Sequence, residues 1–233
     1  TRHKVTEHDI SLTVSPCPKL QKLEWLGRRL SEQTLPFPIN DLTALSEMAV
    51  TPDRIDPTFR FPTQLTSLYL MVMKGRVDVS LLTPLTHLQR LEIGVPENHP
   101  LLDLSGLTTL TWIGATDSPV LLFPTSLVEC NALVRSNCDL SSLTNLTSLR
   151  ILPEPDATLT LPTGLKALSV FDGLLEHSNV ADIALEDFTQ DSMIPIIRED
   201  IEKLPKTLKK IDGGFEPESL RDELREMFPL LEE

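Results

Sequence analysis

The chain has 233 residues, of which 40% are hydrophobic and only 5% aromatic, and its formal net charge is −13. This composition predicts a globular protein with a mainly aliphatic core, long enough for one large domain or two small ones. The negative charge argues against nucleic-acid binding because phosphates would be repelled. The three cysteines form no C-x-x-C motif, and no apolar run reaches the roughly 18 residues of a membrane span, so we expect a cytoplasmic protein with no membrane span.

Residues 1–16 form a polar N-terminal arm with a short alternating tract, Ile10, Leu12 and Val14. We expect this tract to form a strand that caps the N-terminal edge of the core. His3 and His8 also lie in the arm. Two solvent-exposed histidines are favoured over a metal pair, because no third ligand lies nearby.

From residue 17 to residue 215 the chain repeats the apolar pattern L-x-x-L-x-(L/V/I). Each repeat ends in a short alternating tract that predicts a strand, and these strands begin near Leu23, Met48, Leu68, Leu91, Ile113, Cys130, Leu149 and Leu168. The steps of 17 to 25 residues define a period, which predicts a solenoid of parallel strands. A further rung, Leu208 and Ile211, follows 43 residues later, so we expect one degenerate repeat in between.

Two kinds of turn connect the predicted strands. One reads D-(V/L)-S, as at Asp78, Asp103 and Asp139, where the side chains can bond to their own backbone and turn the chain. The other reads (F/L)-P-x-x-L, where proline fixes φ and needs no partner for an N–H. Its prolines are Pro62, Pro124, Pro162 and Pro205. Both turns are short, which leaves little room for long helices between strands.

The rungs resemble leucine-rich repeats, and 161–168 and 204–211 are similar to the L-P-x-x-L-x-x-L repeats of bacterial effectors and amoebal proteins. The resemblance covers residues 17–215 and implies an α/β, β-rich solenoid: a curved right-handed superhelix with a parallel sheet on the concave face and short arcs on the convex face. The family usually has an asparagine five residues after the first strand leucine, and this chain lacks it. We therefore expect coils held by backbone pairing and apolar packing, with irregular curvature.

Helical patterns appear after Phe171. Short helices are predicted after Ser178-Asn179 and from Pro195, and residues 216–233 predict an amphipathic helix in which Leu220, Leu224 and Phe228 share one face. We expect this last helix to cap the end of the solenoid. A partner-binding helix is the alternative.

No catalytic, cofactor-binding or metal-binding set emerges from the sequence, so we expect a non-enzymatic protein without a cofactor. Cys130 and Cys138 occupy positions that hold aliphatic residues in sister repeats, and they are interpreted as core residues. Asn145-Leu146-Thr147 matches the N-glycosylation sequon. Leu146 and Thr147 belong to the repeat pattern, so we interpret the match as a coincidence.

The predicted protein-binding site lies on the concave face, where residues between the ladder positions point out of the sheet. Its members are Glu24, Tyr69, Met71, Glu92, Trp112, Asn131, Leu133, Arg150, Leu152 and Phe171. An exposed apolar stripe of this kind indicates a binding surface. The alternative is a register shifted by one residue, which would bury these side chains.

The favoured function is a scaffold that binds a protein partner of unknown identity on the concave face, as a monomer or weak oligomer. The alternative is a regulatory subunit of an enzyme, such as a phosphatase or small GTPase, acting through the acidic C-terminal quarter. Residues 176–233 hold 16 of the 34 acidic residues and 7 of the 21 basic ones. A secreted adhesin is less favoured, because no disulfide-capped ends are apparent.

Overall fold

The computed structural model describes most of the chain, and it divides into two compact units, Thr1–Pro124 (unit 1) and Thr125–Glu233 (unit 2). Each unit is treated by itself. The described residues are 2–6, 19–26, 29–30, 39, 42–74, 76–96, 102–116, 120–134, 138–153, 158–170, 178–190, 196, 198–214 and 219–231.

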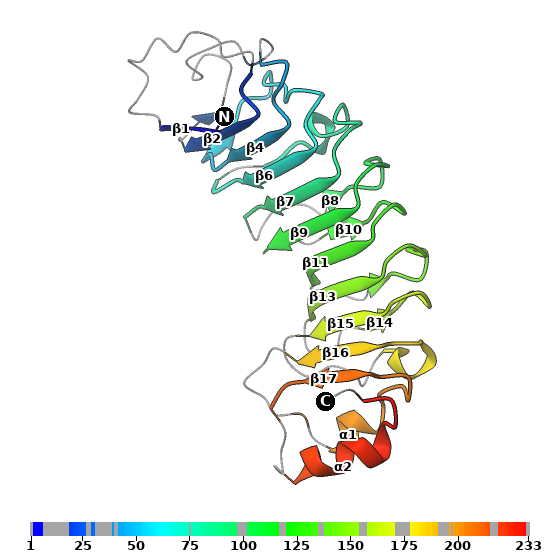
Figure 1. Cartoon of the computed structure of the whole chain (residues 1–233). Helices are drawn as coiled ribbons and strands as arrows, with labels where there is room; N and C mark the ends of the chain where they lie inside the picture. The colour runs from blue at the N-terminus through cyan, green and yellow to red at the C-terminus, as the bar shows by residue number, and fades with distance from the viewer. Residues whose placement is uncertain are drawn as a thin grey trace. The chain divides into compact units, whose positions relative to one another are not determined.

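Unit 1 contains a sheet in which every neighbouring pair of strands is parallel (Figure 1). Its strands, in spatial order, are β1 (Arg2–Thr6), β2 (Lys22–Leu26), β4 (Glu47–Val50), β6 (Ser67–Met71), β7 (Arg90–Gly94) and β9 (Trp112–Thr116). Two small parallel pairs join β3 (Arg29–Leu30) to β5 (Arg54–Ile55) and β8 (Leu102–Asp103) to β10 (Val120–Leu122). Within the described part of unit 1, η3 (Val79–Leu81) is the one helical element whose bounds are assigned, and it is a single 3₁₀ turn.

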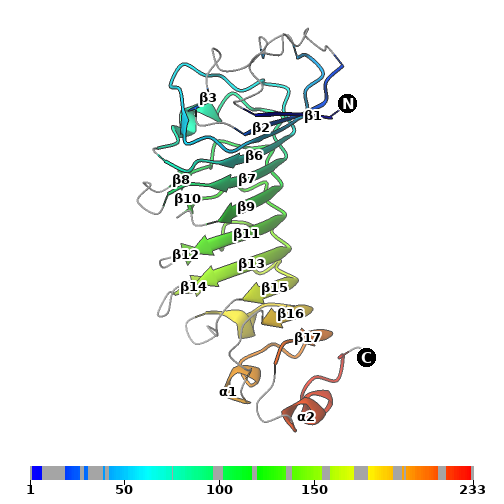
Figure 2. The same ribbon diagram turned by 90° about the vertical axis from the view of Figure 1, so that its left-hand side faces the viewer.

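Unit 2 repeats this arrangement. Its sheet contains β11 (Glu129–Val134), β13 (Ser148–Pro153), β15 (Ala167–Val170), β16 (Asp187–Gln190) and β17 (Lys210–Asp212), all paired in parallel. The small pair β12 (Cys138–Asp139) and β14 (Leu159–Thr160) is set apart from these strands (Figure 2). The helical elements are short: η4 (Val180–Asp182), α1 (Arg198–Ile201) and α2 (Leu220–Met227).

The predicted rungs form the core of both units. Their ladder residues are buried, including Leu23, Met48, Leu68, Leu91, Ile113, Cys130, Leu149 and Leu168. Residues at the intervening positions are half-buried or exposed, as in the iBiBi pattern of β6, except for the buried glycines Gly94 and Gly114. The predicted strand register and the parallel solenoid are therefore confirmed.

The degenerate repeat expected between Leu168 and Ile211 is β16. Phe188 lies opposite Leu168 on one side and Ile211 on the other, and it is fully buried. The next inward position holds Gln190, which is buried with 5% of its surface exposed. The repeat escaped the leucine pattern because an aromatic and an amide replace its two aliphatic strand residues.

Both predicted turn chemistries are present. Asp78, Asp103 and Asp139 each accept a hydrogen bond from the backbone N–H of the serine two residues later, at 2.9, 3.0 and 2.9 Å. Hydrogen bonds from these serines lower the pKa of all three carboxyl groups. In the proline turns, the Pro62, Pro162 and Pro205 carbonyls accept from the N–H three residues later.

Side chains also tie neighbouring coils together, which corrects the expectation of backbone and apolar contacts alone. Where serine or threonine precedes a strand, its hydroxyl donates to the carbonyl of the equivalent residue one coil earlier. These bonds join Ser46 to Gln21, Thr66 to Ser46, Thr111 to Gln89, and Thr147 to Val128. Each of the four carbonyls also accepts two backbone N–H groups from the later coil.

Asparagine side chains also tie coils together. Asn145 Nδ2 donates to the Thr125 carbonyl at 3.0 Å. Leu161 N–H donates to Asn179 Oδ1 at 2.7 Å, and Asn179 Nδ2 donates back to the Leu161 carbonyl at 3.1 Å. Asn179 precedes η4 but makes no capping hydrogen bond to it, so the helix predicted here is only a single 3₁₀ turn. Asn179 lies in the turn before its strand. The family's asparagine lies five residues after the first strand leucine, so the sequence comparison at that position does not find Asn179.

A row of alternating charges crosses three coils of unit 2. Glu186 lies 2.8 Å from Lys209 Nζ and 3.5 Å from Lys166 Nζ. The hydrogen bond from Lys209, then the charges of Lys209 and Lys166, lower the pKa of Glu186 below its usual 4.5. Because all three side chains are largely exposed, the interaction is screened by water and salt.

We expect unit 2 to lose the stabilising contribution of Glu186 in acid. A carboxyl whose pKa is depressed on folding contributes stability above its unfolded pKa and loses it as pH falls through the folded pKa. Glu186→Gln should therefore lower the midpoint of urea unfolding slightly at pH 7 and leave it unchanged at the lowest pH, where wild type has lost the same contribution. Glu129→Gln, an exposed glutamate of β11, serves as the control. An equal loss for Glu186→Gln at both pH values would contradict the assignment.

The chain ends differ in part from expectation. Arg2–Thr6 forms a strand that pairs with β2, and the Ile10–Val14 tract predicted to form a strand lies outside the described residues. The C-terminal helix begins at Leu220, and Leu220, Leu224 and Phe228 are buried. Its role as a cap stays a prediction. Among the described residues, none of the helices has both the length and the hydropathy that crossing a membrane requires.

Candidate functional site

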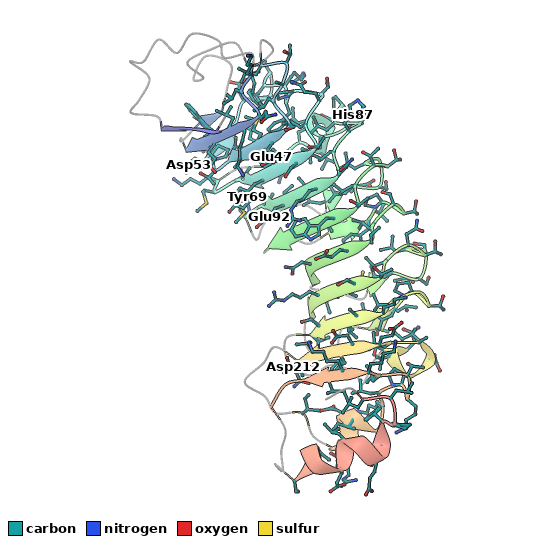
Figure 3. All side chains as sticks on the ribbon, in the orientation of Figure 1. Glu47, Asp53, Tyr69, His87, Glu92 and Asp212 are labelled. Atoms are coloured by element: carbon teal, nitrogen blue, oxygen red, sulfur yellow. The ribbon has the colours of Figure 1, made fainter. Side chains whose placement is uncertain are left out.

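The sheet of unit 1 presents two rows of side chains away from the core. The strand register aligns Lys22, Glu47, Ser67, Arg90 and Trp112 in the first row, and Glu24, Ala49, Tyr69, Glu92 and Gly114 in the second. We call these ten residues, with Met71, the unit 1 face. Figure 3 shows Glu47, Tyr69 and Glu92 on this side of the sheet. Of the five predicted site residues here, all are half-buried: Glu24, Tyr69, Met71, Glu92 and Trp112.

Trp112 lies flat against its own strand and carries a stacked arginine. A Cβ placed on Gly114 would lie 2.7 Å from Trp112 Cη2 and 3.1 Å from Cζ3, so the indole covers this glycine. The Arg90 guanidinium carbon lies 3.6 Å from the indole centroid. Such a cation–π contact contributes about 0.5–1 kcal/mol at an exposed site. The absence of a side chain at Gly114 therefore leaves room for the indole to pack against the strand, and stacking by Arg90 stabilises this position.

Tyr69 and Met71 stand beside small neighbours. Ala49 lies opposite Tyr69 on β4, and Gly94 lies opposite Met71 on β7. Met73, just beyond the strand, is 64% exposed. Tyr69 therefore has a small neighbour on the β4 side, and Met71 has one on the β7 side.

The charges of this face are only partly paired. Lys22 and Glu47 form an ion pair at 3.1 Å across β2 and β4. Lys74 and Asp53 form a second at 3.0 Å, just beyond the ends of β6 and β4. Within the described part of the chain, the Glu92 side chain has no ion pair or hydrogen bond.

The sheet of unit 2 presents a polar surface. The register aligns Asn131, Arg150, Ser169, Thr189 and Asp212 in one row, and Glu129, Ser148, Ala167, Asp187 and Lys210 in the other. We call these ten residues the unit 2 face. Of the predicted site residues, Asn131 is half-buried and Arg150 is exposed. Phe171 and the side chains of Leu133 and Leu152 lie outside what the structure describes. The apolar part of the predicted stripe is therefore seen only in unit 1, as Tyr69, Met71 and Trp112.

Sequence reasoning missed Arg90 and the role of Gly114. Both belong to the outward rows, but Arg90 precedes the first ladder leucine and was not counted. A signal was available, because Arg90 and Trp112 occupy the same position in successive repeats, 22 residues apart. Residues at the same position of successive repeats become neighbours across two strands.

The two described cysteines are free thiols with little reactivity. Burial raises the pKa of Cys130 well above its usual range, and raises that of Cys138 to about 11. Cys138 is only half-buried, unlike Val77 and Leu102 at the same repeat position, which corrects its interpretation as a full core residue. Within the described residues, no group of three or more histidine, cysteine, aspartate or glutamate side chains is arranged to hold a metal ion.

Known structures share this fold. CroV588, a circular leucine-rich-repeat protein, superposes with a TM-score of 0.56 at 16% identity, over 84% of this chain and 34% of its own length, so the chain spans about a third of that protein. The internalin inlF of Listeria monocytogenes matches at 21% identity over 91% of this chain and 70% of its own, with a TM-score of 0.45. No family model matches the sequence, and no curated protein matches it either. The chain therefore has the fold of leucine-rich-repeat proteins, an irregular parallel-strand solenoid.

Proposed function

We propose that this protein is a non-catalytic scaffold that binds a protein partner through the unit 1 face. The observation that carries the proposal is the group Tyr69 and Met71 on β6 and Trp112 on β9, the two strands that flank β7. All three side chains are half-buried in the free chain, and alanine or glycine lies beside them. Aromatic residues and methionine are enriched where partners bind, and arginine is as well. Arg90, stacked on Trp112, adds the fourth such residue.

The proposal places the binding surface on a rigid framework. Each outward residue of the face is flanked along its strand by ladder residues that are buried, such as Leu68 and Leu70 beside Tyr69. A partner then meets side chains whose backbone does not have to be ordered on binding, which lowers the entropic cost of association. The free thiols favour a cytoplasmic location as part of the same proposal.

Tyr69→Ala and Trp112→Ala are expected to weaken partner capture from native cell extract by about tenfold or more each, as hot-spot aromatics do. The melting temperature should stay nearly unchanged, because these side chains point away from the core. Capture is read by mass spectrometry, with Thr189→Ala on the unit 2 face as the control. A large drop in melting temperature in both variants, with capture otherwise intact, would show that the residues stabilise the fold and bind nothing.

The regulatory alternative, through the acidic C-terminal quarter, has less support. The apolar residues of α2 are buried within unit 2, so they are not available as a docking stripe. The exposed carboxylates of this region remain available. Replacing Glu199 and Glu202 by glutamine tests the alternative, because these exposed residues of α1 and the turn after it can change without disturbing the core.

A further inference from the structure

We propose that the unit 1 face receives a cationic side chain: an arginine or lysine of the partner binds between the Glu92 carboxylate and the Tyr69 ring. The inference rests on the proposed function of this face. The inference adds which kind of partner side chain the unit 1 face binds.

Glu92 lies at the centre of the aromatic group. Its register partners are Tyr69 on β6 and Gly114 on β9, and neighbouring strands lie about 4.8 Å apart. The Trp112 indole covers Gly114, and Glu92 Cγ lies 3.3 Å from the position of a Cβ built there. Glu92 therefore has an aromatic residue on each side, and Figure 3 shows it next to Tyr69. The two rings take water away from a side chain that is already half-buried.

No cation within the described part of the chain neutralises this carboxylate. Arg90, two residues earlier on the same side of β7, is the natural candidate, but its guanidinium lies on the Trp112 ring. Lys22 is another base of the unit 1 face, but it lies three strands away on β2 and pairs with Glu47. A partner that covered Glu92 with apolar atoms alone would bury an unpaired charge, which is costly.

The Tyr69 side of Glu92 is the open approach. Arg90 repels an incoming cation, but stacking holds its charge on the Trp112 side. On the β4 side the partner of Tyr69 is Ala49, and Ser67 and Met71 flank Tyr69 along β6. None of these three residues carries a charge. A guanidinium or ammonium group placed there would make a charge-assisted contact with Glu92 and a cation–π contact with the Tyr69 ring.

The test uses a random peptide library displayed on phage and selected on the full chain. Selected peptides are expected to share an arginine or lysine at one fixed position. A synthetic copy of such a peptide should bind Glu92→Gln about tenfold more weakly than wild type, which is the loss of one charge-assisted contact. Glu129→Gln, which changes an exposed glutamate on the unit 2 face, should bind as wild type does. Melting temperatures establish that each variant is folded.

Tryptophan fluorescence supplies a second readout. The chain has two tryptophans, and Trp25 is fully buried while Trp112 lies on the face. Peptide binding should therefore shift the emission of wild type and leave that of Trp112→Phe unshifted. Selected peptides without a shared basic residue, or with equal affinity for Glu92→Gln, would overturn this inference and leave the proposed function standing. A selection that yields no peptide dependent on Tyr69 would overturn both.

Discussion

Phe188→Ala is expected to lower the free energy of unfolding by about 3–5 kcal/mol, the range for removing a fully buried phenylalanine ring. Phe188 is 0% exposed and fills the ladder position of β16, between Leu168 and Ile211. It is the one aromatic residue at the first ladder position of the described unit 2 strands. A truncated side chain would leave a cavity between coils that stiff parallel strands cannot close.

Urea unfolding of the full chain, followed by circular dichroism, measures this effect. Thr189→Ala changes the next residue, which is half-buried on the opposite side of the strand, and should cost no more than about 0.5 kcal/mol. A loss below about 1 kcal/mol for Phe188→Ala would mean that the core of β16 is loosely packed. The degenerate repeat would then be a spacer between two independent groups of coils.

Phe228→Ala is expected to cost about 3–5 kcal/mol and to free α2 from the rest of unit 2. Phe228 is fully buried directly after α2, and its N–H donates to the Leu224 carbonyl at 2.8 Å. Lys206 Nζ lies 4.6 Å from the centroid of the Phe228 ring. An ion pair joins Arg198 of α1 to Glu223 of α2. Because that ion pair is exposed, it contributes little. Burial of the Phe228 ring therefore supplies most of the free energy that docks α2 onto unit 2.

Hydrogen exchange of the α2 amides distinguishes docking from simple stability. In Phe228→Ala, exchange within Leu220–Met227 should become much faster than in the strands of unit 2. Leu230→Ala is the matched control, since Leu230 is 55% exposed and should contribute little. Unchanged protection of α2 in Phe228→Ala would show that contacts other than the Phe228 ring hold the helix in place.

Much of the fold could be predicted because its determinants are local in sequence. Apolar residues occupy every second position of each short strand, and the pattern recurs in each coil. Only one side of each strand can therefore be buried. The Asp-x-Ser and proline turns act within three or four residues, so they too can be seen without the structure. Even β16, which breaks the leucine pattern, was expected from the 43-residue gap.

The contacts between coils were decided by the tertiary structure. Arg90 and Trp112 are separated by 22 residues, and which side chain stacks on which depends on the register between coils of unequal length. The hydroxyl ties of Thr66 and Thr147 and the tie of Asn179 arise in the same way. By itself the sequence determined which side of each strand is buried, because apolar spacing is a property of one repeat. Only the folded chain decided which outward side chains meet, because lateral neighbours are set by how successive coils stack.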